Sequence, residues 1–164
     1  MAYYALSRKW TECDYDPKSE GTLLKKKTDL DPSLVDAYLE THYIVHADPP
    51  FTLRIGEISD PLRNLHRLHG GPSAIITAFN PYSKALSEEE NLARQELLLA
   101  DLLAASYQVI PGIGLHPSNR WPGEPSLLAI GIHAAEAGEL GKKYEQNAIV
   151  YNDAHGLPEL LLLR

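Results

Sequence analysis

The sequence contains a single cysteine, Cys13, among its 164 residues. One thiol can form neither an intramolecular disulfide nor a thiolate cluster around a metal. This composition fits a reducing compartment, so we expect a cytoplasmic protein. No apolar run approaches the roughly 20 residues that a membrane span needs. Residues 1–10 also lack the basic stretch followed by an apolar stretch that marks a signal peptide. We therefore expect no interaction with a membrane.

Basic side chains are also scarce, because 15 Lys and Arg face 22 Asp and Glu, giving a formal net charge of −7. Such a chain repels phosphate backbones, so nucleic acid is not an expected partner. Hydrophobic residues make up 44% and charged residues 23% of the sequence, which is typical of chains that fold rather than remain disordered. The length fits one domain around one core.

Residues 1–30 differ from the rest of the chain. Lys25, Lys26 and Lys27 form the one basic run of the sequence, and no apolar periodicity surrounds them. We interpret this stretch as a partly mobile N-terminal arm, either merely solvated or a contact site for a protein partner or an anionic surface. Residues 31–164 are predicted to form a single α/β domain.

Capping signals place the helices. Asp31 followed by Pro32 predicts a helix to about residue 40, and Asp60 with Pro61 predicts a second one, which ends at Gly70 and Gly71. Ser87 and Glu90 form a capping box that opens a helix to about residue 107. A weaker helix is expected over 134–146.

Apolar runs place the strands between these helices, and a loop rich in proline and glycine is expected over 111–125. The stretch 74–79 is almost entirely apolar, as expected for a central strand that is covered on both faces. The other strands are predicted over 43–47, 51–57, from about 108, 127–132, 148–151 and 159–163.

The order of these elements predicts an α/β to α+β fold with a mixed central sheet, built from two βαβ-like units plus hairpins, with the helices packed on the sheet. Each unit, 53–75 and 128–149, should pair its two strands in parallel through a right-handed crossover. The similarity of the two units reflects either an internal repeat or the general likeness of all βαβ units.

Polar residues follow the predicted central strand. Asn91 and Gln95 share a helix face with buried leucines, Arg94 flanks them, and Asn80 and Ser83 lie just past the strand, where open α/β sheets bind ligands. We expect a pocket there for a polar ligand that is neutral, zwitterionic or cationic, because residues 88–90 are all glutamate. Alternatively, the amides bond the backbone at the strand end and Arg94 pairs with Glu90.

Other possible sites are weaker. His42 with His46, and His66 with His69, have metal-ligand spacing but no accompanying motif, so no metal site is expected. The glycines at 112 and 114 lack the third glycine of a dinucleotide loop, and no cofactor is expected. A set of His116, Glu124 and Ser126 lacks the nucleophile elbow of a serine hydrolase.

Five spaced motifs occur together: 50–56 (PFTLRIG), 77–83 (TAFNPYS), Glu90-Asn91 with Arg94, 121–126 (WPGEPS) and 146–150 (QNAIV). In this pattern the chain resembles the bacterial domain-of-unknown-function family 3293 over about residues 34–164. That family has no established activity, so the resemblance implies site positions without a chemistry. The polar members of the motifs are Asn80, Ser83, Asn91, Arg94, Glu124, Gln146 and Asn147.

Three functions follow as hypotheses. The first is a binding domain for a small polar molecule, oriented by Asn80, Asn91 and Gln146, with residues 121–126 as a lid; replacing Asn91 by leucine should then leave stability unchanged or raised. The second is an enzyme with Glu124 as general base and Arg94 as charge stabiliser. The third is a protein-interaction module that uses the arm or the apolar strand 160–163. Catalytic residues remain unassigned.

Overall fold

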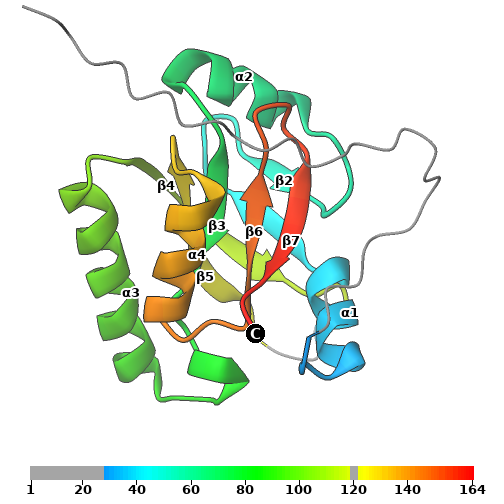
Figure 1. Cartoon of the computed structure of the whole chain (residues 1–164), viewed down its shortest axis with the longest axis vertical. Helices are drawn as coiled ribbons and strands as arrows, with labels where there is room; N and C mark the ends of the chain where they lie inside the picture. The colour runs from blue at the N-terminus through cyan, green and yellow to red at the C-terminus, as the bar shows by residue number, and fades with distance from the viewer. Residues whose placement is uncertain (1–27, 119–121) are drawn as a thin grey trace, which may run out of the picture.

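The computed structural model describes residues 28–118 and 122–164 (Figure 1). The predicted arm, residues 1–30, therefore lies almost wholly outside the described residues. In chain order the elements are α1 (Pro32–Glu40), β1 (His42–Val45), β2 (Phe51–Leu53), α2 (Asp60–His69), β3 (Ser73–Ile76), the short 3-10 turn η1 (Pro81–Ser83), α3 (Glu88–Ala104), β4 (Gln108–Leu115), β5 (Glu124–Ile130), α4 (Ala134–Lys143), β6 (Ala148–Asn152) and β7 (Pro158–Leu162). Within the described chain, no helix combines the length and apolar character that crossing a membrane requires.

The seven strands form one sheet in the order β2-β1-β4-β5-β3-β6-β7, and every neighbouring pair is antiparallel. The predicted α+β class is confirmed, but the predicted mixed sheet with parallel pairs is wrong. The strands of each βαβ-like unit do run in the same direction, yet other strands separate them: β3 lies between β5 and β6, whereas β1, β4 and β5 lie between β2 and β3. The two units thus occupy different places in the sheet, and the arrangement does not repeat.

The centre of the sheet has a known connectivity. Strands β3 to β6 with helices α3 and α4 follow the order β-α-β-β-α-β, and they lie side by side as β4-β5-β3-β6. This is the split βαβ arrangement of ferredoxin-like folds, in which each helix crosses over one intervening strand. Strands β1 and β2 extend the sheet beyond β4, and β7 extends it beyond β6.

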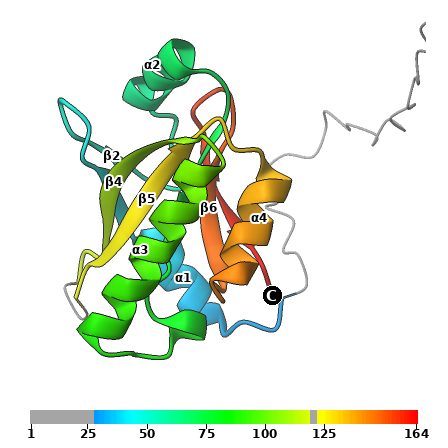
Figure 2. The same cartoon turned by 90° about the vertical axis from the view of Figure 1, so that its left-hand side faces the viewer.

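The two faces of the sheet are covered differently. Helices α3 and α4 lie on one face (Figure 2), where Ile76, Leu98 and Leu102 belong to a buried core. The opposite face carries α2 at one end and α1 at the other (Figure 1). Helix α2 buries Leu62 in a second core with Leu128, but α1 has no fully buried residue. The sheet is therefore packed tightly under α2 and loosely under α1.

Local capping chemistry sets the helix boundaries. Asp31 Oδ1 accepts a hydrogen bond from the backbone N–H of Ser33 at 2.8 Å, and the Ser87–Glu90 capping box is present in both directions. Helix α2 begins one residue earlier than predicted, because Ser59 rather than Asp60 is its N-cap. Gly70, with φ of 85°, ends that helix as expected.

The predicted loop over 111–125 is too long, because residues 111–115 belong to β4 and residues 124–125 belong to β5. Strands β4 and β5 pair Gly112 with Ser126 and Gly114 with Glu124. Glycine serves here to let strands approach closely, since a Cβ on Gly112 would lie 2.6 Å from the carbonyl oxygen of Ile44. The predicted lid, 121–126, is wrong for residues 124–126, which belong to β5, and Trp121 lies outside the described residues.

Replacing Ser87 by alanine is expected to lower the free energy of unfolding by about 1 kcal/mol, because Ser87 caps the longest helix. Ser87 Oγ accepts from the backbone N–H of Glu90 at 3.2 Å, and Glu90 Oε2 accepts from that of Ser87 at 3.0 Å. The change is read from the midpoint of denaturant unfolding. A midpoint equal to that of the wild type would show that the capping box contributes nothing to stability.

Candidate ligand pocket between helix α1 and the sheet

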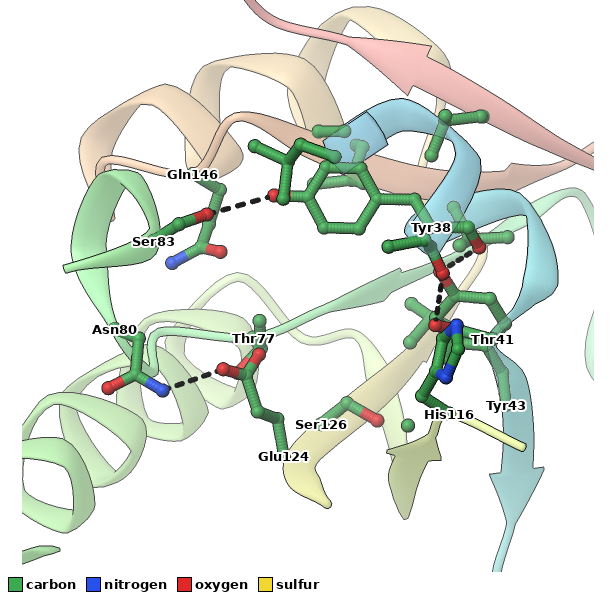
Figure 3. Close-up of a pocket in the computed structure, with 18 of the residues that line it drawn as sticks. Tyr38, Thr41, Tyr43, Thr77, Asn80, Ser83, His116, Glu124, Ser126 and Gln146 are labelled. Carbon is green, nitrogen blue, oxygen red and sulfur yellow. Dashed lines mark hydrogen bonds between the residues drawn. The ribbon is translucent and has the colours of Figure 1, made fainter. Parts of the chain in front are cut away.

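A cavity of about 470 Å³ lies between α1 and the sheet (Figure 3). This volume falls in the range of about 300–1,000 Å³ that is usual for ligand pockets. The side chains of Ile75, Ala148, Val150 and Leu160 form an apolar floor, and those of Asn80 and Glu124 lie together at one end, which we call the polar end. The remaining lining residues are Ser33, Leu34, Ala37, Tyr38, Thr41, Tyr43, Thr77, Asn80, Ser83, Ala85, Gly114, His116, Glu124, Ser126, Gln146 and Ile149.

Small residues on the sheet create this space. Alternate residues of a strand share one face, so Glu124 and Ser126 of β5 point to the same side as the buried Leu128. Their cross-strand partners on β4 are Gly114 and Gly112, which present no side chain. Because α1 packs on the sheet without burying any residue fully, the space beside Gly114 remains part of the cavity.

The polar end is built around the side chains of Asn80 and Glu124. Asn80 Nδ2 donates to Glu124 Oε1 at 2.6 Å (Figure 3). Asn80 Oδ1 accepts from Asn91 Nδ2 at 3.0 Å and from the backbone N–H of Leu86 at 3.2 Å. These two donors fix the orientation of the amide, so that its nitrogen must face the carboxylate. Among residues 28–118 and 122–164, no other hydrogen bond reaches the carboxylate of Glu124.

The backbone that carries Asn80 is strained. Asn80, Tyr82 and Ser83 all have positive φ, at 46°, 50° and 59°. Left-handed conformations of residues other than glycine are uncommon, and they persist only where the surroundings enforce them. Here the backbone N–H of Asn80 donates to Asn91 Oδ1 at 2.8 Å, and that of Tyr82 donates to the carbonyl of Glu145 at 2.7 Å. The strain is thus held by α3 and by the segment that follows α4.

Hydrogen bonds link the side chains of Tyr38, Ser83 and Asn147 beside the cavity. The hydroxyl oxygens of Tyr38 and Ser83 lie 3.2 Å apart, and Asn147 Nδ2 donates to Ser83 Oγ at 2.9 Å. Below them, the Tyr43 hydroxyl donates to the carbonyl of Tyr38 at 3.0 Å. Burial raises the pKa of Tyr43 well above its usual value, so this tyrosine stays neutral.

The predicted site residues divide into two groups. Asn80, Ser83, Glu124 and Gln146 line the cavity. Asn147 is behind Ser83, and Asn91 and Arg94 are outside the lining. The sequence did not indicate that α1 and β1 form the far side of the cavity. The segment 32–40 has the pattern of an ordinary amphipathic helix, which carries no sign of a ligand site.

Asn91, Gln95 and Arg94 instead bond the main chain where β3 ends. Gln95 Oε1 accepts from the backbone N–H of Ala78 at 2.8 Å, as Asn91 does from Asn80. Arg94 donates to the carbonyls of Ala78 and Tyr144, at 2.9 and 2.8 Å. The alternative in which the amides bond backbone is therefore correct for this helix face, whereas Arg94 pairs with Glu145, at 3.3 Å, rather than with Glu90.

His116 is the other titratable group at the cavity besides Glu124 and the tyrosines. Its Nδ1 lies 2.7 Å from Ser118 Oγ and its Nε2 lies 3.2 Å from the carboxylate of Glu40. Both ring nitrogens are thus directed at protein groups. In the part of the chain that the structure describes, no group of three or more His, Cys, Asp or Glu is placed to hold a metal ion.

Comparison with known proteins gives one match. Neither the curated proteins nor the solved structures contain a significant match to this chain. A family model described as "Protein of unknown function (DUF3293)" matches residues 76–149, from the end of β3 into β6. This stretch includes Asn80, Glu124 and Gln146 but neither α1 nor β1. Residues 76–149 thus match the domain-of-unknown-function family 3293, which the chain resembles in its motifs.

Proposed function

We propose that this domain binds a small polar molecule in the cavity under α1. The observation that supports this most is the Glu124 carboxylate, which Asn80 holds at one end of an otherwise largely apolar cavity. Ligand sites commonly combine an apolar lining with a few convergent polar groups that set orientation. The ligand would place its polar end at Glu124 and its apolar part over Ile75, Val150 and Leu160.

The polar end is preorganised for binding. Because two donors already fix the amide of Asn80, its bond to Glu124 requires no rearrangement when a ligand enters. Preorganised groups lose little conformational freedom on association, and this favours affinity. The strained segment 80–83 fits the same proposal, since backbone strain concentrates at functional sites.

The other two hypotheses find less support. An enzyme that pairs Glu124 with Arg94 needs both side chains at one site, but Arg94 is outside the cavity lining and is bonded to main-chain carbonyls. In the strand proposed as an interaction surface, Leu160 lines the cavity, while Leu161 and Leu163 pack against the core. We place the proposed binding protein in the cytoplasm, which its single cysteine favours.

The test uses 1-hexanol as the probe, because it has a polar head and an apolar chain without charge. We expect saturable shifts of the backbone amide signals of Ala37, Ile75 and Ala148 in ¹H–¹⁵N spectra, with a Kd of about 1 mM for so small a molecule. Ala148→Phe fills the floor of the cavity and should weaken binding at least tenfold, and Ala148→Leu should do so less.

The matched control is Ala135→Phe, which makes the same substitution at an exposed position of α4. It should bind hexanol like the wild type. The proposal fails if the wild type shows no saturable shifts, or if a folded Ala148→Phe variant binds as tightly as the wild type.

A further inference from the structure

The described lining of the cavity includes a carboxylate but no lysine or arginine to balance its negative charge. This carboxylate belongs to Glu124, and it is the one carboxylate among the described residues that line the cavity. The partner that Asn80 supplies is a neutral amide. A carboxylate that is partly withdrawn from water is best stabilised by an opposite charge, and a single amide bond replaces only part of its hydration.

Nearby cations are engaged elsewhere. Arg94 bonds two carbonyls and Glu145, as described above. The guanidinium of Arg164 lies 4.8 Å from the centre of the Tyr82 ring, and its NH1 donates to Asn147 Oδ1 at 3.4 Å. His116 belongs to the lining, but Glu40 and Ser118 bond its ring nitrogens. None of these groups forms an ion pair with Glu124 within the described chain.

The remaining polar groups around the cavity also favour a positive charge. Tyr38 and Tyr43 present aromatic rings and hydroxyl oxygens, and both can stabilise a cation. Burial raises the pKa of Tyr43, and the field of the nearby Glu124 carboxylate adds a smaller contribution. The same field would repel an anionic ligand.

Resting on the proposed function, we infer that the ligand is an organic cation: an amine whose ammonium group binds the Glu124 carboxylate and whose apolar chain lies on the floor formed by Ile75, Val150 and Leu160. The ammonium would donate to Glu124 Oε2 and take the place of water there. A charge-assisted bond of this kind is about twice as strong as a bond between neutral groups. The Asn80–Glu124 pair therefore determines which head group the cavity accepts.

Three probes that share one tail test this inference: hexylammonium, 1-hexanol and hexanoate, each titrated into the full chain and followed by ¹H–¹⁵N spectra. We expect hexylammonium to bind at least 10-fold more tightly than hexanol, and hexanoate to bind more weakly than either. In Glu124→Gln, which keeps an acceptor for Asn80, hexylammonium should lose this advantage while hexanol still binds.

Two further variants control for the change of charge and for structural damage. Glu124→Asp keeps the negative charge and should retain a preference for hexylammonium over hexanoate. Glu57→Gln removes an exposed carboxylate that is outside the lining and should leave the order of the three probes unchanged.

Each failure has a distinct meaning. If hexanol binds but hexylammonium binds no more tightly, or if Glu124→Gln keeps the full preference, the cation inference is wrong and the proposed function stands. If hexanoate binds most tightly, the inference is also overturned. If none of the three probes binds, both the pocket and its specificity are rejected.

Discussion

Replacing Asn91 by leucine is expected to lower the free energy of unfolding by about 2–3 kcal/mol. The Asn91 side chain is buried and bonds Asn80 twice, accepting from its backbone N–H at 2.8 Å and donating to its Oδ1 at 3.0 Å. Leucine leaves that N–H without an acceptor, which costs about 1–3 kcal/mol, and removes a second bond worth about 1 kcal/mol. Burial of the leucine side chain offsets only part of this loss.

This expectation reverses the one drawn from the sequence, in which Asn91→Leu was to be neutral or stabilising. That interpretation assigned the Asn91 side chain to ligand binding, whereas in the structure it accepts a hydrogen bond from the left-handed backbone at Asn80. The substitution should also weaken hexanol binding, because the orientation of Asn80 toward Glu124 depends on the Asn91 amide.

Urea unfolding of Asn91→Leu and of a control, Asn64→Leu, measures the effect. Asn64 is an exposed residue of helix α2, so the same substitution there should change stability by no more than about 0.5 kcal/mol. If the two variants unfold at the same urea concentration, Asn91 does not hold the Asn80 backbone in the way its hydrogen bonds indicate.

Replacing Gly112 by alanine is expected to destabilise the protein by about 2–3 kcal/mol, because the added methyl group overpacks the sheet. The Cβ would lie 2.6 Å from the carbonyl oxygen of Ile44 and 3.3 Å from Ser126 Oγ. The first contact is with main chain of the neighbouring strand, so rotation of a side chain cannot relieve it. Strands β1 and β4 would have to move apart.

Gly114→Ala provides the matched control two residues along the same strand. Its Cβ would meet Thr41 Cγ2 at 3.4 Å and the Tyr43 ring at 3.7 Å, which are ordinary contacts. Both substitutions reduce the conformational entropy of the unfolded chain equally, so the difference between their unfolding midpoints isolates the steric clash. Equal stability of the two variants would show that the approach of β1 to Gly112 is not tight.

Features that depend on a few neighbouring residues could be predicted from the sequence. Asp31 and the Ser87–Glu90 pair act within one turn of helix, and Gly70 ends α2 through its own backbone conformation. The placement of Asn80 shortly after the buried strand β3 also indicated one side of the site. In each case the interacting groups are close in the chain, so the pattern of residues specifies the contact.

Strand pairing and the set of residues that line the cavity depend on contacts between residues that are distant in the sequence. Two strands joined by a helix have the same sequence pattern whether they pair directly or are separated by another strand. Strands β5 and β6 illustrate this, because β3 lies between them. Likewise Gly112 and Gly114 indicate a loop as readily as two strands in close approach. The bond between Asn80 and Glu124, 44 positions apart, and the placement of α1 over it exist because long-range packing brings them together. Packing energy summed over the whole sheet, rather than any local propensity, fixes these contacts.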